Sequence, residues 1–353
     1  MVMYSKILEE KKQKVDGGKK LSGQKYLESI YLGGGTPSRL SIPKVSELLK
    51  YVRDHFPWSE NIEITFEMNP EDVTPEYLDD LAKIGVNRLS LGGQSFQTST
   101  LGKLGRCHTV SELRCACEAI ANSPLNNWNI DLMFGIPEQS IAMIKKDVEE
   151  ALSYKPPHIS LYGLEIHERT PFGQNAKIRK WVTEHQEQFE KMYLWATDRL
   201  EKAGLLQYEV SNFSKKGNEG RNNLLVWSGQ DYLGFGAGAH SFKEQTRRGN
   251  IRSIKSYLNL LEKRTLPTEF KEQLTTTQLA TEFLMLGLRR SEGVNLDNWL
   301  NRFGLHWGTQ EEKYVHSLCE QGYAIRKGSS LCLTPKGMLI ADRITVQLMP
   351  SDS

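Results

Sequence analysis

Short apolar runs alternate with longer segments of helical periodicity from about residue 28 to about residue 210. The apolar runs end in glycine or a polar residue, as strands do, and several longer segments end in glycine or proline, as helices do. The expected strands cover residues 28–32, 62–66, 87–91, 128–134, 158–164 and 208–213. The expected helices cover residues 43–56, 74–85, 111–122, 141–154 and 185–204. This alternation predicts an α/β fold with a parallel sheet, in the manner of a partial (β/α) TIM-type barrel.

Polar residues follow the expected strands closely. They are residues 33–36, Glu67, Gln94, Asp131 and Glu165. Because ligands bind at the carboxyl end of the strands in such barrels, we expect these positions to converge on one mouth. The alternative is that each polar residue only marks the place where its strand ends.

The pattern changes after about residue 215, where a glycine-rich segment without a clear repeat begins. Two helical stretches, residues 276–290 and 311–322, then precede a hairpin-like stretch over residues 324–344. Helices followed by a short two-stranded turn predict a small winged-helix-like domain. We therefore expect a barrel over residues 1–215, a connecting segment packed on it over residues 216–268, and a C-terminal helical domain over residues 269–353.

Composition excludes several classes of partner. The 45 basic residues nearly balance the 43 acidic ones, and the formal charge of +2 provides no field that would attract nucleic acid. No apolar run approaches the roughly 18 residues of a membrane span, and the first residues lack the apolar core of a targeting signal. The five cysteines are scattered and odd in number, which is not typical of a disulfide framework. These features predict a cytoplasmic protein that has no membrane span and binds no nucleic acid.

The stretch YLGGGTPS places three glycines between a strand and a helix. Such a loop lets a ligand approach the backbone closely, but it lacks both the lysine of a P-loop and the spacing of a dinucleotide fingerprint. It becomes specific in combination with ITFEMNP, RLSLGGQSF, LGRCH and IDLMFGIPEQ, which follow in this order. The series continues with HISLYGLEIHERTPFG, YEVSNF, DYLGFGAGAHSF and LTPKGMLIAD.

This series resembles the HemW and coproporphyrinogen-oxidase branch of the radical-SAM superfamily, from about Tyr26 to near the C-terminus. The resemblance implies a radical-SAM barrel that binds S-adenosylmethionine (SAM). The implied cofactor-binding residues are Gly34, Gly35, Thr36, Glu67, Gln94, Arg106 and Asp131. Their chemistry suits the cofactor, because carboxylates can hold its ammonium group and ribose hydroxyls while arginine holds its carboxylate.

The family also binds a 4Fe-4S cluster through a CxxxCxxC loop, and no cysteine precedes the glycine loop in this sequence. Cys115 and Cys117 lie two residues apart on an expected helix, so their side chains point to different sides and make a poor substitute. We therefore assign neither a metal site nor a catalytic residue, and expect radical chemistry only with further N-terminal sequence. Residues 4–14 have the character of the helix after a lost first strand, which would expose the edge of residues 28–32. A truncated gene model and a cluster-free binding protein both stay open.

The resemblance also implies haem as a ligand, with haem-accepting proteins as partners. The family motif HNxxYW carries a candidate haem-ligating histidine, and its place is taken here by Asn222, which is no normal axial ligand. His108 and His240 remain, and we expect both to be structural. The leading hypothesis is a haem chaperone of the HemW type. The alternatives are an oxygen-independent coproporphyrinogen III oxidase, which decarboxylates a porphyrinogen, and a cluster-free binding protein.

Overall fold

The structure is a computed structural model that describes residues 5–9, 25–168 and 170–349. Its main feature is an eight-stranded sheet in the order β1-β2-β3-β4-β5-β6-β8-β7. The strands are β1 (Ser5–Glu9), β2 (Lys25–Leu32), β3 (Trp58–Met68), β4 (Arg88–Gln94), β5 (Trp128–Phe134), β6 (His158–Gly163), β7 (Leu206–Gln207) and β8 (Asn212–Ser214). Strands β2 to β6 are parallel and in sequence order. The prediction of a partial barrel built from a parallel sheet is confirmed.

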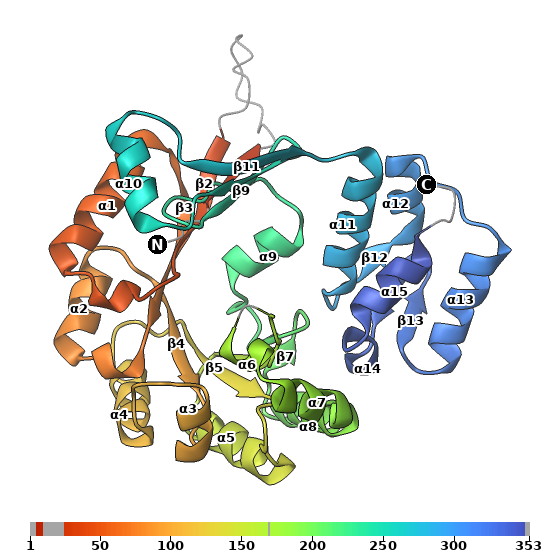
Figure 1. The fold of residues 1–353 in the computed structure, drawn as a ribbon, viewed down its shortest axis with the longest axis horizontal. Coiled ribbons are helices and arrows are strands. Elements are labelled where there is room, and N and C mark those ends of the chain that lie inside the picture. The colour runs from red at the N-terminus through yellow and green to blue at the C-terminus, as the bar shows by residue number, and fades with distance from the viewer. Residues whose placement is uncertain (1–4, 10–24, 169, 350–353) are drawn as a thin grey trace.

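Helices connect these strands and lie along the outside of the curved sheet (Figure 1). They are α1 (Ile42–His55), α2 (Pro75–Lys83), α3 (Thr98–Lys103), α4 (Val110–Ala121), α5 (Ile141–Ser153), α6 (Pro171–Gln174), α7 (Ala176–Glu184) and α8 (Gln186–Lys202). The five helices predicted before residue 204 correspond to α1, α2, α4, α5 and α8, with ends within one or two residues.

The period-2 alternation of β3 explains why the two faces of the sheet differ. Ile64 and Phe66 point into the main apolar cluster with the helices, whereas Glu63 and Thr65 line a small polar cavity inside the barrel. Burial of a side chain such as Phe66 contributes about 2 kcal/mol. The apolar face therefore holds the sheet against its helices, and the polar face is available for ligands.

Two predicted elements differ from the structure. Residues 5–9 form β1, which pairs antiparallel with β2. The prediction of a helix over residues 4–14 is therefore wrong for residues 5–9. Residues 4 and 10–14 lie outside the described residues. This pairing provides hydrogen-bond partners for backbone groups at the edge of β2. That gain outweighs the helix preference of residues 5–9, which is worth only about tenths of a kcal/mol per residue. The pairing also covers the edge that we expected to be exposed.

The predicted strand over residues 208–213 is the second difference. The chain instead makes a turn between β7 and β8, with the N–H of Tyr208 donating to the carbonyl of Asn212 at 3.1 Å. The carboxylate of Glu209 accepts from the N–H of Ser211 at 3.3 Å and stabilises this turn. β8 consequently runs antiparallel to β6.

The glycine-rich segment that follows crosses the open side of the barrel. Its elements are α9 (Arg221–Trp227), β9 (His240–Lys243), β10 (Thr246–Asn250), α10 (Ile254–Glu262) and β11 (Thr268–Gln273). The three strands form a separate antiparallel sheet in the order β11-β10-β9. The carboxylate of Glu63 in β3 accepts from the backbone N–H groups of Arg221 and Asn222, both at 3.0 Å, and so fixes the start of α9 to the barrel.

The C-terminal part has its own apolar cluster around the fully buried Trp299. Its elements are α11 (Thr276–Leu288), β12 (Val294–Asn295), α12 (Leu296–Phe303), α13 (Thr309–Glu320), β13 (Ala324–Lys327), β14 (Ser330–Leu333), α14 (Pro335–Met338) and α15 (Ala341–Leu348). Helices with a three-stranded sheet in the order β12-β14-β13 confirm the winged-helix-like prediction. The hairpin ends at Leu333, however, and the rest of the expected hairpin region is helical because Thr334 caps a new helix that begins with Pro335.

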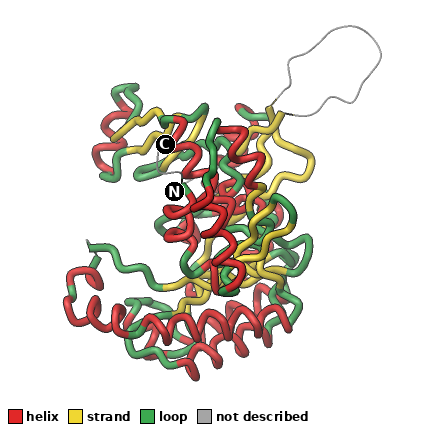
Figure 2. Tube along the Cα trace, turned by 90° about the vertical axis from the view of Figure 1, so that its right-hand side faces the viewer, coloured by secondary structure: helices red, strands yellow, loops and turns green. Residues whose placement is uncertain are grey.

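In Figure 2 the helices and strands of this part gather around the C-terminus. Backbone hydrogen bonds join it to the barrel at the turn after β7, where Val210 donates to Arg289 at 2.9 Å and Ser291 donates to Tyr208 at 3.1 Å. Within the described ranges, no helix combines the length and the apolar character needed to cross a membrane. The domain boundaries at residues 215 and 268 stay a prediction.

Candidate functional site at the barrel mouth

All the predicted cofactor-binding residues except Arg106 lie on or just after strands that are adjacent in the sheet. Gly34 follows β2, Glu67 is near the end of β3, Gln94 ends β4, and Asp131 lies in β5. Because β2 to β5 are parallel, the residues that follow them lie at one end of the barrel. Glu165, which we also expected there, lies beyond β6 as an exposed side chain 3.7 Å from His167.

The glycine loop after β2 is shaped around the carboxylate of Glu67. The N–H of Gly34 donates to one oxygen at 3.0 Å, and the hydroxyl of Tyr31 donates to the other at 2.6 Å. A Cβ atom at Gly33 would lie 2.5 Å from the Tyr31 ring and 2.7 Å from a Glu67 oxygen, so a larger residue here would displace one of these side chains. Gly34 and Gly35 have φ angles of 74° and 69°, which also favour glycine. Thr36 follows as an exposed residue before a short 3-10 helix.

Asp131 is the second carboxylate of the mouth. It accepts from the hydroxyl of Ser90 at 3.3 Å and from the side-chain amide of Asn129 at 2.8 Å. Burial raises the pKa of Asp131 to about 7, hydrogen bonds from Ser160 and Ser90 oppose the increase, and the charge of Glu67 adds to it. The two carboxylates are therefore close enough to interact electrostatically.

Arg106 is exposed between α3 and α4, and its charge lowers the pKa of Asp131, so it also lies within electrostatic range of the mouth. Gln94 is buried with a φ angle of 64°, an unusual backbone conformation for this residue type. The buried carboxylate of Asp147 stabilises the following turn by accepting from the Ser95 hydroxyl at 2.7 Å and the N–H of Phe96 at 2.8 Å. The QSF motif thus fixes the position of Gln94 through α5.

A cavity of about 470 Å³ opens beside the glycine loop. Of the predicted residues, Gly34 and Glu67 line it; Gly35, Thr36, Gln94, Arg106 and Asp131 lie outside its lining. The lining residues that the sequence did not indicate as ligand contacts include Tyr31, Tyr162, Glu209, Ser211, Asn212, Trp227 and Tyr232. Asn222, in the place of the family histidine, also lines this cavity, with its side-chain oxygen accepting from the Ser29 hydroxyl at 3.2 Å.

Two buried acceptors in this cavity are unsatisfied. Among the described residues, neither Oε1 of Glu209 nor Oδ1 of Asn212 has a hydrogen-bond partner, and both residues are at most 4% exposed. Burial raises the pKa of Glu209 to about 7, which hydrogen bonds from Ser211 and Asn212 oppose. Unpaired buried acceptors favour a ligand that donates hydrogen bonds. The sequence did contain a signal for these two ligand contacts, because Glu209 and Asn212 are polar residues within the otherwise apolar run YEVSNF. We interpreted that run only as a strand.

The residues present do not fit a 4Fe-4S cluster. Cys107 and Cys115 are exposed, Cys117 is buried in α4, and Cys319 and Cys332 lie in the C-terminal part. In the described portion of the chain, no group of three His, Cys, Asp or Glu side chains is arranged to hold a metal ion. We therefore derive no reaction step through the cluster. His108, the histidine beside Cys107, is buried, and its Nε2 lies 3.2 Å from the carbonyl of Gly93.

Comparison with known proteins agrees with this arrangement. Residues 6–151 match the model of the radical SAM superfamily, and residues 274–340 match the HemN C-terminal domain. Heme chaperone HemW of Bacillus subtilis is 33% identical over 92% of this chain and 86% of the relative. Heme chaperone HemW of Mycobacterium tuberculosis strain H37Rv is 32% identical over 92% and 81%, respectively. The solved structure of coproporphyrinogen III oxidase (HemN) from Escherichia coli, a radical SAM enzyme, superposes with a TM-score of 0.76 at 19% identity, covering 92% of this chain and 78% of that one.

A curved parallel sheet with a glycine loop after β2, followed by a HemN-type C-terminal domain, defines a protein of the radical SAM class, whose members generally bind SAM and a 4Fe-4S cluster. Within that class, sequence identity above 30% over most of both chains shows the closer relationship, and the chain belongs to the HemW family. The HemN structure, at 19% identity, supports the fold alone. The HemW hypothesis is thus supported over the coproporphyrinogen oxidase alternative.

Proposed function

We propose that this protein is a haem-handling member of the HemW family that binds SAM at the barrel mouth and passes haem to haem-accepting proteins. The observation that carries the SAM part is the grouping of the Gly34 loop, Glu67 and Asp131 at one end of consecutive parallel strands, next to a cavity of about 470 Å³. The haem part is supported by relatives named heme chaperones. The unpaired cysteines agree with a reducing compartment such as the cytoplasm.

The side chains of the mouth match the groups of SAM by charge. Glu67 suits the ammonium group, and Arg106 suits the carboxylate through charge-assisted hydrogen bonds. Asp131 suits ribose hydroxyls, for which its ionised form is the better acceptor. Gly35 offers backbone groups to the ligand, and Thr36 offers its hydroxyl. Gln94 offers its side-chain amide.

Isothermal titration calorimetry with SAM and the purified full chain tests these assignments. We expect Glu67→Ala combined with Asp131→Ala to weaken SAM binding by roughly a hundredfold, because each lost charge-assisted contact is worth about 1.5–3 kcal/mol. The matched control removes two exposed carboxylates from the outer helices, Glu47→Ala with Asp79→Ala, and should leave the affinity unchanged. Equal SAM affinity in both double variants would disprove the assignment.

Haem binding is tested separately by titrating ferric haem into the protein and recording its Soret band. A saturable shift with one haem per chain is expected. Haem that remains spectrally free at micromolar protein concentration would contradict the chaperone proposal, whatever the result with SAM.

A further inference from the structure

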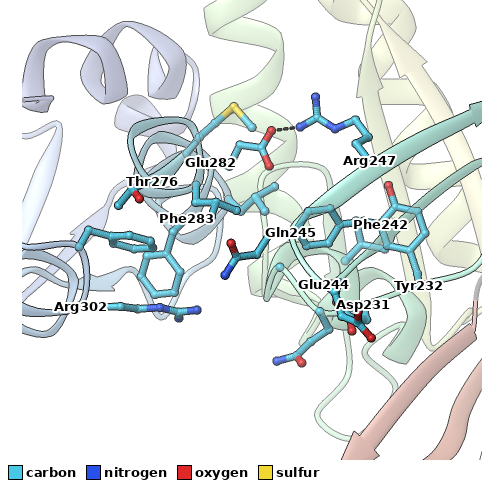
Figure 3. A pocket seen from close by; sticks show the side chains of 17 residues that line it. Asp231, Tyr232, Phe242, Glu244, Gln245, Arg247, Thr276, Glu282, Phe283 and Arg302 are labelled. Carbon is cyan, nitrogen blue, oxygen red and sulfur yellow. Dashed lines mark hydrogen bonds and ion pairs between the residues drawn. The ribbon is translucent and has the colours of Figure 1, made fainter. Parts of the chain in front are cut away.

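A second cavity, of about 510 Å³, lies between the glycine-rich segment and the C-terminal helices (Figure 3). One side comes from residues 226–247, and the other from α11 and α12. Its size is in the range of cavities that enclose ligands of several hundred daltons, and cavities where two parts of a chain meet are common ligand sites. None of the predicted cofactor-binding residues lines it.

Two pairs of aromatic rings line the cavity from its two sides. The rings of Tyr232 and Phe242 are 6.4 Å apart, and those of Phe283 and Phe303 are 5.8 Å apart. Figure 3 shows Tyr232 and Phe242 on the side of the glycine-rich segment, with Phe283 on the opposite side. Together with aliphatic residues of α11 such as Leu279, these rings provide surfaces suited to a large flat apolar molecule.

The two arginines that line the cavity, Arg247 and Arg302, differ in whether an acidic side chain neutralises them. Arg247 forms ion pairs with Glu282 and, at 3.6 Å, with Glu272. Arg302 instead lies over the rings of Phe283 and Phe303, at 4.9 and 5.2 Å from their centroids, and it has no ion pair within the part of the chain that the structure describes. Its guanidinium is therefore available for an anionic group of a ligand.

The opposite side of the cavity carries acidic groups. Asp231 and Glu244 both line it, and Figure 3 shows them beside Tyr232 and away from Arg302. Glu244 is in an ion pair with Lys243 at 3.5 Å, whereas Asp231 has no ion pair among the described residues. A ligand with carboxylates along one edge would therefore be repelled by Asp231 and attracted to Arg302. The charge distribution thus gives such a ligand one preferred orientation.

We propose that this cavity binds a tetrapyrrole that carries carboxylates, namely the haem cargo, with the flat ring between the two aromatic pairs and a propionate on Arg302. This inference rests on the proposed haem-handling function. Val226 and Tyr232 line both this cavity and the one at the barrel mouth, so the cargo would lie next to the SAM site. Asn222 lines the mouth cavity and does not line the present one, which separates this site from the position of the family histidine.

The test titrates the full chain with protoporphyrin IX, ferric haem and protoporphyrin IX dimethyl ester, following quenching of tryptophan fluorescence. Arg302→Glu should weaken binding of the two free acids by roughly tenfold or more, the loss of one charge-assisted hydrogen bond, and leave the dimethyl ester unaffected. Arg343→Glu is the matched control, because Arg343 is also an exposed arginine of the C-terminal part but lies outside the cavity lining. It should bind all three compounds as the wild type does.

Leu279→Trp, which fills the cavity from α11, should weaken all three compounds, and circular dichroism should establish that each variant is folded. Wild-type affinity for the free acids in both Arg302→Glu and Leu279→Trp would overturn the assignment to this cavity while leaving the haem-handling function intact. A wild-type chain that binds neither haem nor protoporphyrin would overturn the proposed function itself. Equal weakening of acids and ester in Arg302→Glu would overturn the role of the charge.

Discussion

At the residue scale, the mouth depends on close contacts that leave no room for an added atom. A Cβ added at Gly33 would overlap Tyr31 and Glu67, and the Glu67 carboxylate in turn accepts from the N–H of Gly34. The sequence allowed us to predict that this loop approaches a ligand, because three successive glycines follow a strand. It did not indicate that Tyr31 completes the loop, since a tyrosine in an apolar strand is equally typical of a core.

We expect Gly33→Ala to displace Glu67 and reduce SAM affinity by at least about tenfold. Overpacking should also lower the free energy of unfolding by about 1–3 kcal/mol. Gly102→Ala is the control, because Gly102 lies in α3 with nothing within 4 Å of an added Cβ, so alanine there should be neutral or slightly stabilising. Calorimetry and urea denaturation measure both effects. Undiminished SAM affinity in Gly33→Ala would show that Glu67 does not act through this loop.

Asp131 should make stability depend on pH with a defined sign. Its pKa is about 7 in the folded protein and 3.8 as the ordinary value, so between these values the folded state binds a proton that the unfolded state lacks. The stabilisation is fully present below about pH 4 and is lost as pH rises through about 7. Relative to Asp131→Asn, which cannot titrate, the wild type should therefore lose stability between pH 5 and pH 8 in urea denaturation. A difference between the two proteins that stays constant over this range would refute the assigned pKa.

At the scale of elements, periodicity was sufficient wherever an element packs on one face. The short apolar run of β3 and the helical periodicity of α1, α2, α4, α5 and α8 predicted these elements, because burial of their apolar side chains determines them. It failed for residues 5–9 and 208–213, where pairing with a strand edge and a turn stabilised by Glu209 decide the conformation. The placement of α9 was not predictable either, since its contact with Glu63 joins residues about 160 positions apart.

Glu63 should determine how firmly α9 is held over the barrel. Removing its carboxylate leaves the N–H groups of Arg221 and Asn222 without their acceptor, so we expect Glu63→Ala to cost about 2 kcal/mol. Amide hydrogen exchange should accelerate over residues 221–227. Glu63→Gln, which keeps an acceptor oxygen, should restore part of the protection, and Glu60→Ala, an exposed glutamate of the same strand, should change nothing. Unchanged exchange in Glu63→Ala would mean that α9 is held by other contacts.

At the scale of the whole molecule, each of the two apolar clusters supports the elements that form one of the two cavities. The larger cluster supports the sheet and its helices, and thereby the mouth, whereas the cluster around Trp299 supports α11 and α12, which carry Phe283, Phe303 and Arg302. The two parts meet at the turn after β7, where Glu209 pairs with Arg290 in an isolated β-bridge. A defect in the smaller cluster should therefore affect the proposed haem site before it affects the SAM site.

Trp299→Ala provides that defect. Trp299 is fully buried, and its ring N–H donates to the carbonyl of Ala280 at 2.9 Å, so truncation should cost about 3–5 kcal/mol within the C-terminal part. We expect porphyrin binding to be lost while SAM affinity stays within about twofold of the wild type, because local unfolding of a separate cluster need not extend to the barrel. Leu81→Ala, a fully buried position of the larger cluster, is the reciprocal variant and should weaken SAM binding. Simultaneous loss of both ligands in Trp299→Ala would show instead that the two clusters unfold as one cooperative unit, with the backbone contacts of Val210 and Ser291 strong enough to couple them.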